Sequence, residues 1–551
     1  MDSRAHDLIS RGDQLFGKRG SLMSLQQEIA ENFYPQRADF TRSIYLGEEF
    51  CANLTSSYPL IVHRELSNAF SAMLRPREQP WFAITVDKPE KLDKAGKAWL
   101  QWATDVQRRA MYDRVSQFQR ATKEGDADFA AFGQAIITKE IDRNENALLY
   151  RCWHFRDTAW AEKYNGTIGE IHRKWKPTIQ ALCKQFPKTV PEKLKARCEK
   201  EPYTQVECRH IVVCADDYQI PGKKFNSKRF PWVSVYLSLD EETILEEVPS
   251  KSMIYTIPRW QTVSGSQYAY SPATVAGLPD ARLLQAMTLT LLEAGEMAVR
   301  PPMIATKNAI RSDVNLFSGG ITWVDAEYDE RLGEVLRPLT QDKGGLPFGK
   351  EIHGDTREML AQAFYLNKLN LPSPTRDMTA YETSQRIQEY IRSALPLFEP
   401  MEIEYNGSLC EDTFWDMFNN NMFGPVQNLP QSIQGENIRF TFESPLHQAI
   451  EKQKGQIFLQ GGQMIAQAVQ LDPSAQFVVD AVTALRDALE GLGMPAPWIR
   501  DAQEAQAIID QHRQDAQDQQ QMSQVGQGAD VAQKVALAQQ ALTGSAAGAA
   551  Q

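Results

Sequence analysis

The most enzyme-like segment of this chain is the run GGLPFGKE at residues 344–351. It matches the G-x-x-x-x-G-K part of a P-loop, in which main-chain N–H groups cradle phosphates and a following Ser or Thr hydroxyl holds magnesium. Glu351 stands where that hydroxyl is required, and Pro347 removes one N–H group from the cradle. The run is therefore more typical of a turn before a helix than of a nucleotide site.

Other groups that do chemistry in proteins are scattered along the chain. None of the eight histidines forms an H-x-x-x-H pair, which a zinc hydrolase would need, and no G-x-S-x-G run supports a serine hydrolase. The acidic pairs Asp216-Asp217 and Glu246-Glu247 remain as candidates for two-metal nuclease chemistry. Such pairs are more typical of solvated turns. We expect no catalytic residue, no metal and no cofactor.

The cysteines and the apolar runs bear on the compartment. The chain has seven cysteines, an odd number, and none of them forms a C-x-x-C pair. This pattern favours a reducing cytoplasm over a disulfide framework or a zinc site. No apolar run approaches the roughly 20 residues that span a bilayer. We therefore expect no association with a membrane.

The charge balance limits how the chain can bind nucleic acid. Its net charge of −11 argues against tight, sequence-independent DNA binding, which needs Lys and Arg to displace counterions. Lys368 and Arg376 flank a proline-rich break at residues 371–374 and would meet DNA phosphates if that break projected into a channel. A solvated surface loop is the equal alternative. The basic cluster Lys223, Lys224, Lys228 and Arg229 is interpreted as an exposed loop.

The elements that would position these groups are clearest between residues 270 and 395. Pro279 is predicted to open a long helix that the pair Pro301-Pro302 closes. Short strands follow, and the pattern Asp355-x-x-Glu358 predicts a capping box for a return helix that ends at Pro372. Thr379-x-x-Glu382 then predicts the start of another helix. The segment is strongly organised, yet it contains no catalytic grouping.

Apolar residues in the first of these helices recur at alternating steps of three and four. This spacing gives a seam of the coiled-coil type, only about two heptads long. A seam this thin needs neighbours, so packing between subunits of an oligomer is its natural explanation. The residues of the predicted subunit-packing seam are Leu284, Met287, Leu291 and Ala298, with Ala294 between them.

The rest of the chain predicts a mixed α+β fold that is predominantly helical. One helix is expected up to Pro35, a second over 60–74, and a third from about 92 to 130 with a break near Gly125. Strands are expected over 81–86, 135–140, 148–155, 211–213, 232–237 and 253–257. From Pro445 the chain is rich in Gln and Ala, and its last residues have no capacity to bury a core.

Five segments, taken in order, resemble the head-to-tail connecting proteins of bacteriophages, the portal proteins of short-tailed phages. They extend over about 400 residues, and the ordered set is more specific than any one member. They are IVHRELSNAFSAMLRP at 61–76 with QPWF at 79–82, DFAAFGQA at 128–135, LPDA at 278–281 with RPP at 300–302, MTAYET at 378–383, and FESPL at 442–446. Tyr381 departs from the smaller polar residue expected there.

The resemblance implies a portal fold built of a wing, a stem, a clip and a helical crown or barrel. On this map residues 1–272 are the wing, 273–302 and 350–372 the stem helices, and 303–349 the clip. Residues 373–443 form the tunnel loop and the return through the wing, and 444–551 form the crown, with a disordered end.

The resemblance also implies function and partners. The chain would form a ring of about twelve subunits at one capsid vertex, in the virion, after assembly in the host cytoplasm. DNA would enter and leave through the ring without sequence-specific binding. The terminase large subunit, tail adaptor proteins, the major capsid protein and the scaffolding protein are the implied partners. The alternatives are another oligomeric virion component, such as an internal-core or tail protein, and a metal-dependent nuclease.

Overall fold

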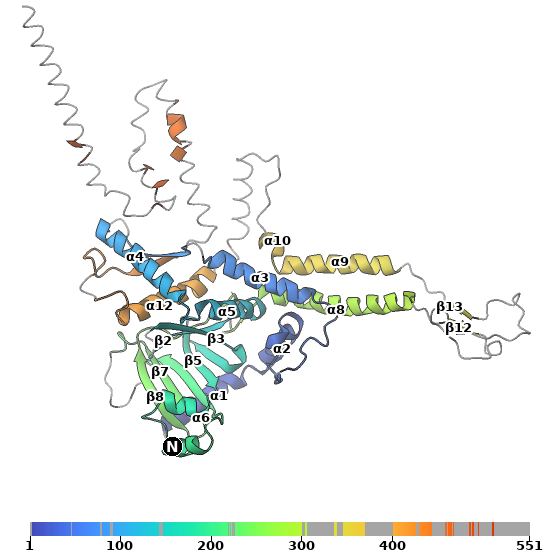
Figure 1. The fold of residues 1–551 in the computed structure, drawn as a ribbon, viewed down its shortest axis with the longest axis horizontal. Coiled ribbons are helices and arrows are strands. Elements are labelled where there is room, and N and C mark those ends of the chain that lie inside the picture. The colour runs from blue at the N-terminus through green and yellow to red at the C-terminus, as the bar shows by residue number, and fades with distance from the viewer. Residues whose placement is uncertain are drawn as a thin grey trace, which may run out of the picture. The chain divides into compact units, whose positions relative to one another are not determined.

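The computed structural model describes residues 3–45, 47–77, 80–88, 92–142, 147–218, 220, 222, 226–299, 303–305, 336–338, 345–369, 401–425 and 429–442, with scattered positions between 458 and 511. The chain divides into two compact units. One unit comprises Met1–Thr85, Ala103–Asn428 and Ile438–His447, and the other Val86–Trp102, Leu429–Asn437 and Gln448–Gln551. The predicted mixture of helices and strands is confirmed (Figure 1).

The N-terminal segment forms two helices where one was predicted. The break between α1 (Ser3–Gly17) and α2 (Gly20–Phe33) lies at Arg19, whose side chain is buried. Its guanidinium donates to the carbonyls of Phe155, Arg156 and Thr158 at 2.6–3.1 Å. This contact with another part of the fold sets the break. The short 3₁₀ helix Pro35–Arg37 follows, and α3 (Tyr58–Leu74) confirms the second predicted helix.

The third predicted helix is also two helices, and the predicted break near Gly125 was wrong. The helices are α4 (Lys94–Met111) and α5 (Phe118–Phe132), so Gly125 lies inside α5. Gln117 has a φ of 56°, which ends helical geometry before α5. The Ser116 hydroxyl donates to the Met111 carbonyl, and the Ser116 carbonyl accepts from Tyr150 N–H at 2.8 Å. The sequence pattern does not reveal these local bonds.

The two largest sheets in the described part of the first unit are antiparallel. The predicted pair is confirmed as β2 (Ile136–Asp142) with β3 (Ala147–Trp153), and the two-residue β9 (Tyr255–Thr256) pairs on the other side of β2. The larger sheet has the order β4-β5-β6-β7-β8. Its strands are β4 (Thr158–Glu162), β5 (Ile168–Trp175), β6 (Cys208–Cys214), β7 (Trp232–Ser238) and β8 (Thr243–Ser250).

Helices cover both faces of the larger sheet. On one face Leu8 of α1 packs with Ile211 and Val235. On the other face α6 (Ile179–Gln185) and α7 (Glu192–Lys200) pack against Cys208 and Tyr236. Alternating residues of β6 and β7 therefore meet different helices, as the pleat requires.

Smaller elements complete the first unit. Strand β1 (Phe82–Val86), which begins there, pairs with β14 (Ile438–Phe442), and β10 (Gln261–Thr262) pairs with β11 (Ala269–Tyr270). A π-helix over Glu402–Gly407 leads into α12 (Ser408–Asn419). No helix in the described part of the chain is long and apolar enough to cross a membrane.

The long helix of the 270–395 segment starts earlier than predicted. It is α8 (Pro272–Val299), so Pro279 lies inside the helix rather than at its start. Pro279 costs one main-chain hydrogen bond there, and packing in the core around Leu278 and Ala281 outweighs that cost. The helix ends just before Arg300-Pro301-Pro302, as expected.

The return helix also starts earlier than predicted. It is α9 (Gly345–Ala363), so Asp355 lies inside it and does not cap it. Residues 345–349, which were assigned to the strand-rich insert, are helical. The helix ends near Tyr365, whose φ of 58° interrupts it before α10 (Leu366–Leu369). Strands β12 (Met303–Ala305) and β13 (Leu336–Pro338) pair antiparallel in the insert. The predicted stop at Pro372 and the Thr379 cap lie outside the described residues.

Candidate subunit interface on the helical hairpin

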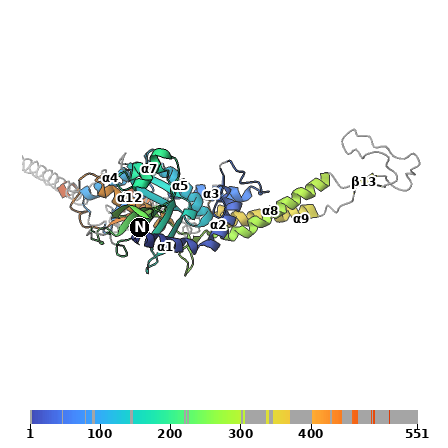
Figure 2. The same cartoon turned by 90° about the horizontal axis from the view of Figure 1, so that it is seen from below.

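Helices α8 and α9 form an antiparallel hairpin that extends from the first unit's sheet-bearing body (Figures 1 and 2). A Cβ atom placed on Gly349 would lie 3.0 Å from Leu291 Cδ2, and one on Gly277 would lie 2.8 Å from Leu360 Cδ1. The two helices are therefore in close contact at both places, which requires residues without side chains.

One polar contact lies between these two apolar ones. Thr288 Oγ1 donates to the Leu284 carbonyl at 2.7 Å and lies 3.1 Å from His353 Nε2. Because the hydroxyl proton is already used, His353 Nε2–H is the donor in the second bond. Burial and the nearby Arg357 both lower the pKa of His353, so its ring is neutral at pH 7.

Side-chain bonds fix the base of α8 to α2 and to the segment just before α3. Arg282 Nε donates to Glu28 Oε1 at 2.6 Å. Gln285 Oε1 accepts from the main-chain N–H groups of Thr55 and Ser56, each at 2.8 Å. The hairpin is thus held at one end by the body of the unit.

The structure places the predicted packing residues on the side of α8 that meets the chain's own elements. Leu284 is fully buried in the core, and Leu291 packs on Gly349. Met287 and Ala298 are half-buried. Leu284 and Leu291 thus pack within the chain, and the role of the seam between subunits stays a prediction.

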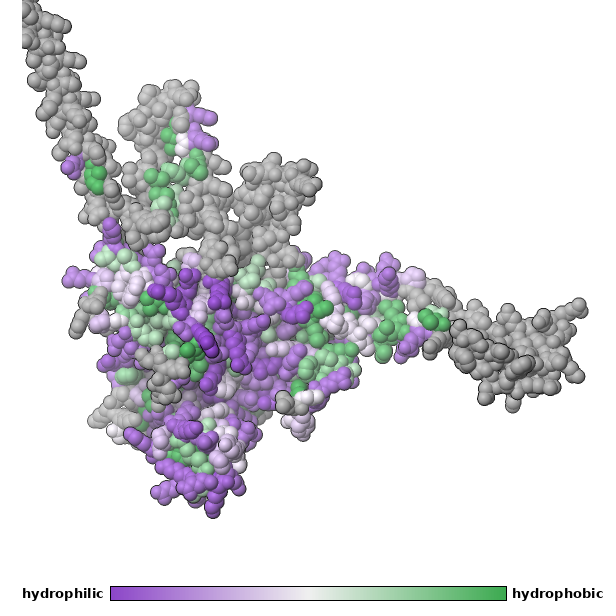
Figure 3. Space-filling view, in the orientation of Figure 1, coloured by the Kyte–Doolittle hydropathy of each residue, from purple (hydrophilic) through white to green (hydrophobic). Residues whose placement is uncertain are grey.

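Other apolar residues of the hairpin face solvent, and we call these residues its outer apolar surface. From 283 to 299 the only charged residues are Glu293 and Glu296, so α8 is apolar on several sides. A helix that is apolar all round is normally buried. Figure 3 shows hydrophobic residues along the hairpin. The outer apolar surface comprises Leu283 (45% exposed), Leu289 (48%), Leu292 (57%), Met297 (48%), Val299 (81%), Phe348 (65%) and Met359 (48%).

The described residues do not test the predicted DNA contacts of Lys368 and Arg376. The backbone of Lys368 lies in α10, and Arg376 lies outside the described residues. Of the predicted basic loop cluster, Arg229 lies beside the Phe230 ring, and residues 223–225 are outside the described part.

The groups weighed for catalysis have structural roles. Glu247 accepts bonds from Arg4 and Tyr218, and Asp217 lies in a turn after β6.

All seven cysteines are free. Within the described residues, no group of three or more His, Cys, Asp or Glu side chains is placed to hold a metal. The Gly345–Glu351 part of the P-loop-like run is the first two turns of α9.

Sequence reasoning missed the glycines and the outer apolar surface of the hairpin. Gly277 and Gly349 are small residues at points of close helix contact, but glycine alone does not identify its partner. The abundance of Leu and Met on several sides of α8 was a usable signal, because an amphipathic helix would have concentrated them on one face.

The chain is similar to known proteins in sequence and in structure. Residues 5–500 match the model of the family "Bacteriophage head to tail connecting protein". The chain is 28% identical to a probable portal protein of Bordetella phage BPP-1 over 464 residues, covering 80% of this chain and 79% of the relative. It is 24% identical to the portal protein of Salmonella phage epsilon15, covering 95% and 93%. A chain from the neck of an empty gene transfer agent particle aligns at 10% identity and a TM-score of 0.36, covering 85% of this chain and 99% of that one.

Proposed function

The chain belongs to the family of bacteriophage head to tail connecting proteins, and we propose that it acts as a ring of about twelve copies at one capsid vertex. It is a phage portal protein, and the family is a structural one. The family match over most of the chain disfavours both earlier alternatives, the other virion component and the metal-dependent nuclease.

The observation that carries the ring is the outer apolar surface of the hairpin. Seven large apolar side chains stand 45–81% exposed on two adjacent helices of one copy. Exposed apolar side chains grouped in this way mark protein interaction sites. In a ring each hairpin has two identical neighbours, so one copy's surface meets another's without any further partner.

The parts of the portal are assigned by this proposal as follows. Residues 1–272 form the wing, 273–302 and 350–372 the stem, and 303–349 the clip, with the α9 helix already begun at Gly345. Residues 373–443 carry the tunnel loop and return, and 444–551 form the crown. Lys368 and Arg376 face the channel and contact DNA phosphates transiently as DNA passes.

The same proposal sets the partners and location. The ring sits in the virion at the portal vertex after assembly in the host cytoplasm with the major capsid and scaffolding proteins. The terminase large subunit docks on it during packaging, and the tail adaptor binds afterwards. The channel passes double-stranded DNA, and the net charge of −11 favours passage over tight binding.

Complementation tests the packaging role. In phage whose own gene for this chain is deleted, the wild-type chain supplied in trans should restore nuclease-protected DNA in heads. A variant with Lys368→Glu and Arg376→Glu should restore less. A normal yield of DNA-filled heads with no copy of the chain supplied would overturn the proposed function.

A further inference from the structure

A small polar hollow lies between strands β3 and β5. Its volume is about 50 Å³, and Arg151, Trp153 and Arg173 line it together with Glu140, Gln185 and Tyr236. It opens on the side of β5 away from α1, because His172, the next residue, packs under Gly12 of α1. A hollow this size exceeds the roughly 10–15 Å³ that one water needs, so a group of several atoms fits.

The floor of the hollow is a buried cation that forms no ion pair with a carboxylate of the described residues. The Arg173 side chain is almost fully buried, its Nε donates to the Tyr255 hydroxyl at 2.8 Å, and its guanidinium lies 3.7 Å from the Trp153 ring centre. Its Nη1 is enclosed and has no hydrogen-bond partner, and no carboxylate of the described residues forms an ion pair with it. A buried charge in this state is strongly unfavourable unless an opposite charge joins it.

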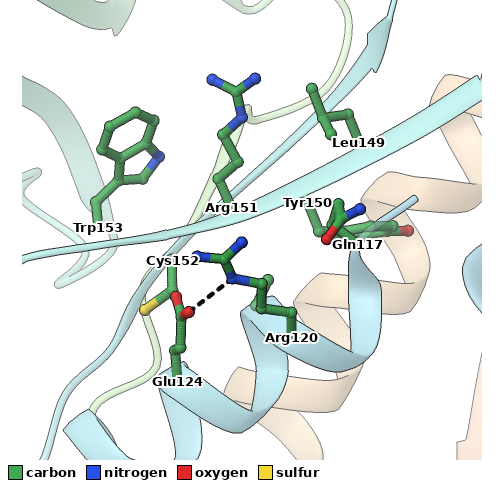
Figure 4. A pocket seen from close by; sticks show the side chains of 9 residues that line it. Gln117, Arg120, Glu124, Leu149, Tyr150, Arg151, Cys152 and Trp153 are labelled. Atoms are coloured by element: carbon green, nitrogen blue, oxygen red, sulfur yellow. Dashed lines mark hydrogen bonds and ion pairs between the residues drawn. The ribbon is translucent and has the colours of Figure 1, made fainter. Parts of the chain in front are cut away.

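A second arginine stands at the rim. Figure 4 shows Arg151 on the same side of β3 as Leu149 and Trp153, opposite Cys152. In the part of the chain that is described, no ion pair involves the Arg151 guanidinium, and the side chain is exposed. Arg151 also lines a larger hollow of about 390 Å³ against α5. Its planar fork is therefore free to bind a group in the smaller hollow.

The remaining lining groups leave the hollow positive. Glu140 is its one carboxylate, and the Tyr236 hydroxyl lies 3.5 Å from Glu140 Oε1, in position to donate to it. The Trp153 indole N–H is used by Thr138 Oγ1 at 2.8 Å. Two guanidinium groups and the Gln185 amide remain as donors, against one carboxylate. Arginine forks pair with planar or tetrahedral oxyanions through two oxygens at once.

We propose that this hollow is an oxyanion site, in which Arg173 and Arg151 together hold a carboxylate or phosphate group. The shared chemistry is a small anion with at least two exposed oxygens. A free phosphate and the side-chain carboxylate of a protein are its two sources, and the test separates them.

The test is titration of the full chain by calorimetry with inorganic phosphate and, separately, with glutamate, at constant ionic strength set by chloride. We expect one saturable site per chain for at least one of the two anions. Phosphate binding alone identifies a free phosphate as the ligand, and glutamate binding alone a protein carboxylate. Heat from neither anion overturns the proposal.

Matched variants tie the binding to the hollow. Arg151→Gln, at an exposed position, should weaken binding at least tenfold, and Arg173→Lys, which keeps the charge but removes the fork, should abolish it. Arg64→Gln on α3, another exposed arginine, should bind as the wild type does. A dissociation constant for Arg151→Gln within twofold of the wild-type value overturns the proposal, whether or not the Arg173 variant folds.

Discussion

The guanidinium of Arg75, the residue that ends α3, donates to the carboxylate of Asp126 inside α5, and both side chains are almost completely enclosed. Arg75 also donates to Asn406 Oδ1 at 2.8 Å and lies over the Tyr405 ring at 4.6 Å. One buried cation therefore joins α3, α5 and the π-helix before α12. This junction ties residues far apart in sequence into the body that carries the hairpin.

Asp126→Asn should destabilise the chain strongly, because it leaves the Arg75 charge enclosed without its partner. The expected loss is about 3–5 kcal/mol, measured by urea denaturation. The exposed pair Arg120–Glu124 within α5 is the matched control, and Arg120→Gln should change stability by less than about 1 kcal/mol. Equal midpoints for the two variants would contradict this account of the junction.

Glycine at position 277 is required by the contact between α8 and α9. Gly277→Ala places a methyl group 2.8 Å from Leu360 and 3.1 Å from Phe364, both fully buried. Gly295→Ala in the same helix meets nothing within 4 Å. Both variants gain the same helix propensity, so the difference between them isolates overpacking, about 1–3 kcal/mol. Equal melting temperatures for the two variants would contradict the close contact between α8 and α9 at position 277.

Asp416 makes stability depend on pH in a defined window. Burial raises its pKa to about 6, although the Ser252 hydroxyl and Lys139 partly oppose the shift. A raised pKa means that the folded chain holds this proton more tightly, so the contribution is present below about pH 4 and is lost as pH rises through 6.

Asp416→Asn should remove that dependence. Relative to the wild type, it should gain up to about 3 kcal/mol between pH 4 and pH 7, as followed by urea denaturation at several pH values. The assignment to Asp416 would be refuted if the difference in unfolding free energy between the wild type and the variant did not change with pH across this range.

Leu292→Asp should block ring assembly without unfolding the chain. The side chain is 57% exposed in a single copy, so a carboxylate is tolerated there, but it is unfavourable when a neighbouring copy buries it. Sedimentation velocity should find a monomer with the wild-type circular dichroism spectrum. Val263→Asp, at a 55% exposed apolar residue outside α8 and α9, is the control that should still assemble. Assembly by the Leu292 variant would exclude this face from the interface.

The sequence predicted those elements whose pattern is local. α3, β1 and the β2–β3 pair have clear periodicity, and they are found where expected. Strand β5 was not predicted, because Glu170, His172 and Arg173 read as polar. Glu170 and His172 are buried as bonded partners, because His172 Nε2 bonds Glu170 at 2.7 Å and Arg11 of α1 bonds Glu170 at 2.7 Å. Such pairing depends on a distant helix and leaves no trace in the local pattern.

The candidate interface could be predicted only in part, because it also depends on contacts that the local sequence pattern does not reveal. The seam through Leu284 and Leu291 was visible as a three-and-four spacing, but the spacing does not tell whether its partner is the chain's own α9 or a second copy. Gly349 places Leu291 against α9 of the same chain, and the packing of the seam between subunits stays a prediction. The outer residues, such as Leu283 and Leu292, became candidates only when the structure left them exposed.

Electron cryomicroscopy of the assembled wild-type chain tests the central claim most directly. We expect a ring with an axial channel and a mass of about twelve times 62.3 kDa. In that ring, we expect the side chains of Leu283, Leu289 and Leu292 of each copy to be buried against the adjacent copy. A ring in which these three side chains remain in solvent would contradict the interface. A compact monomer under all conditions of concentration and salt would contradict the ring itself.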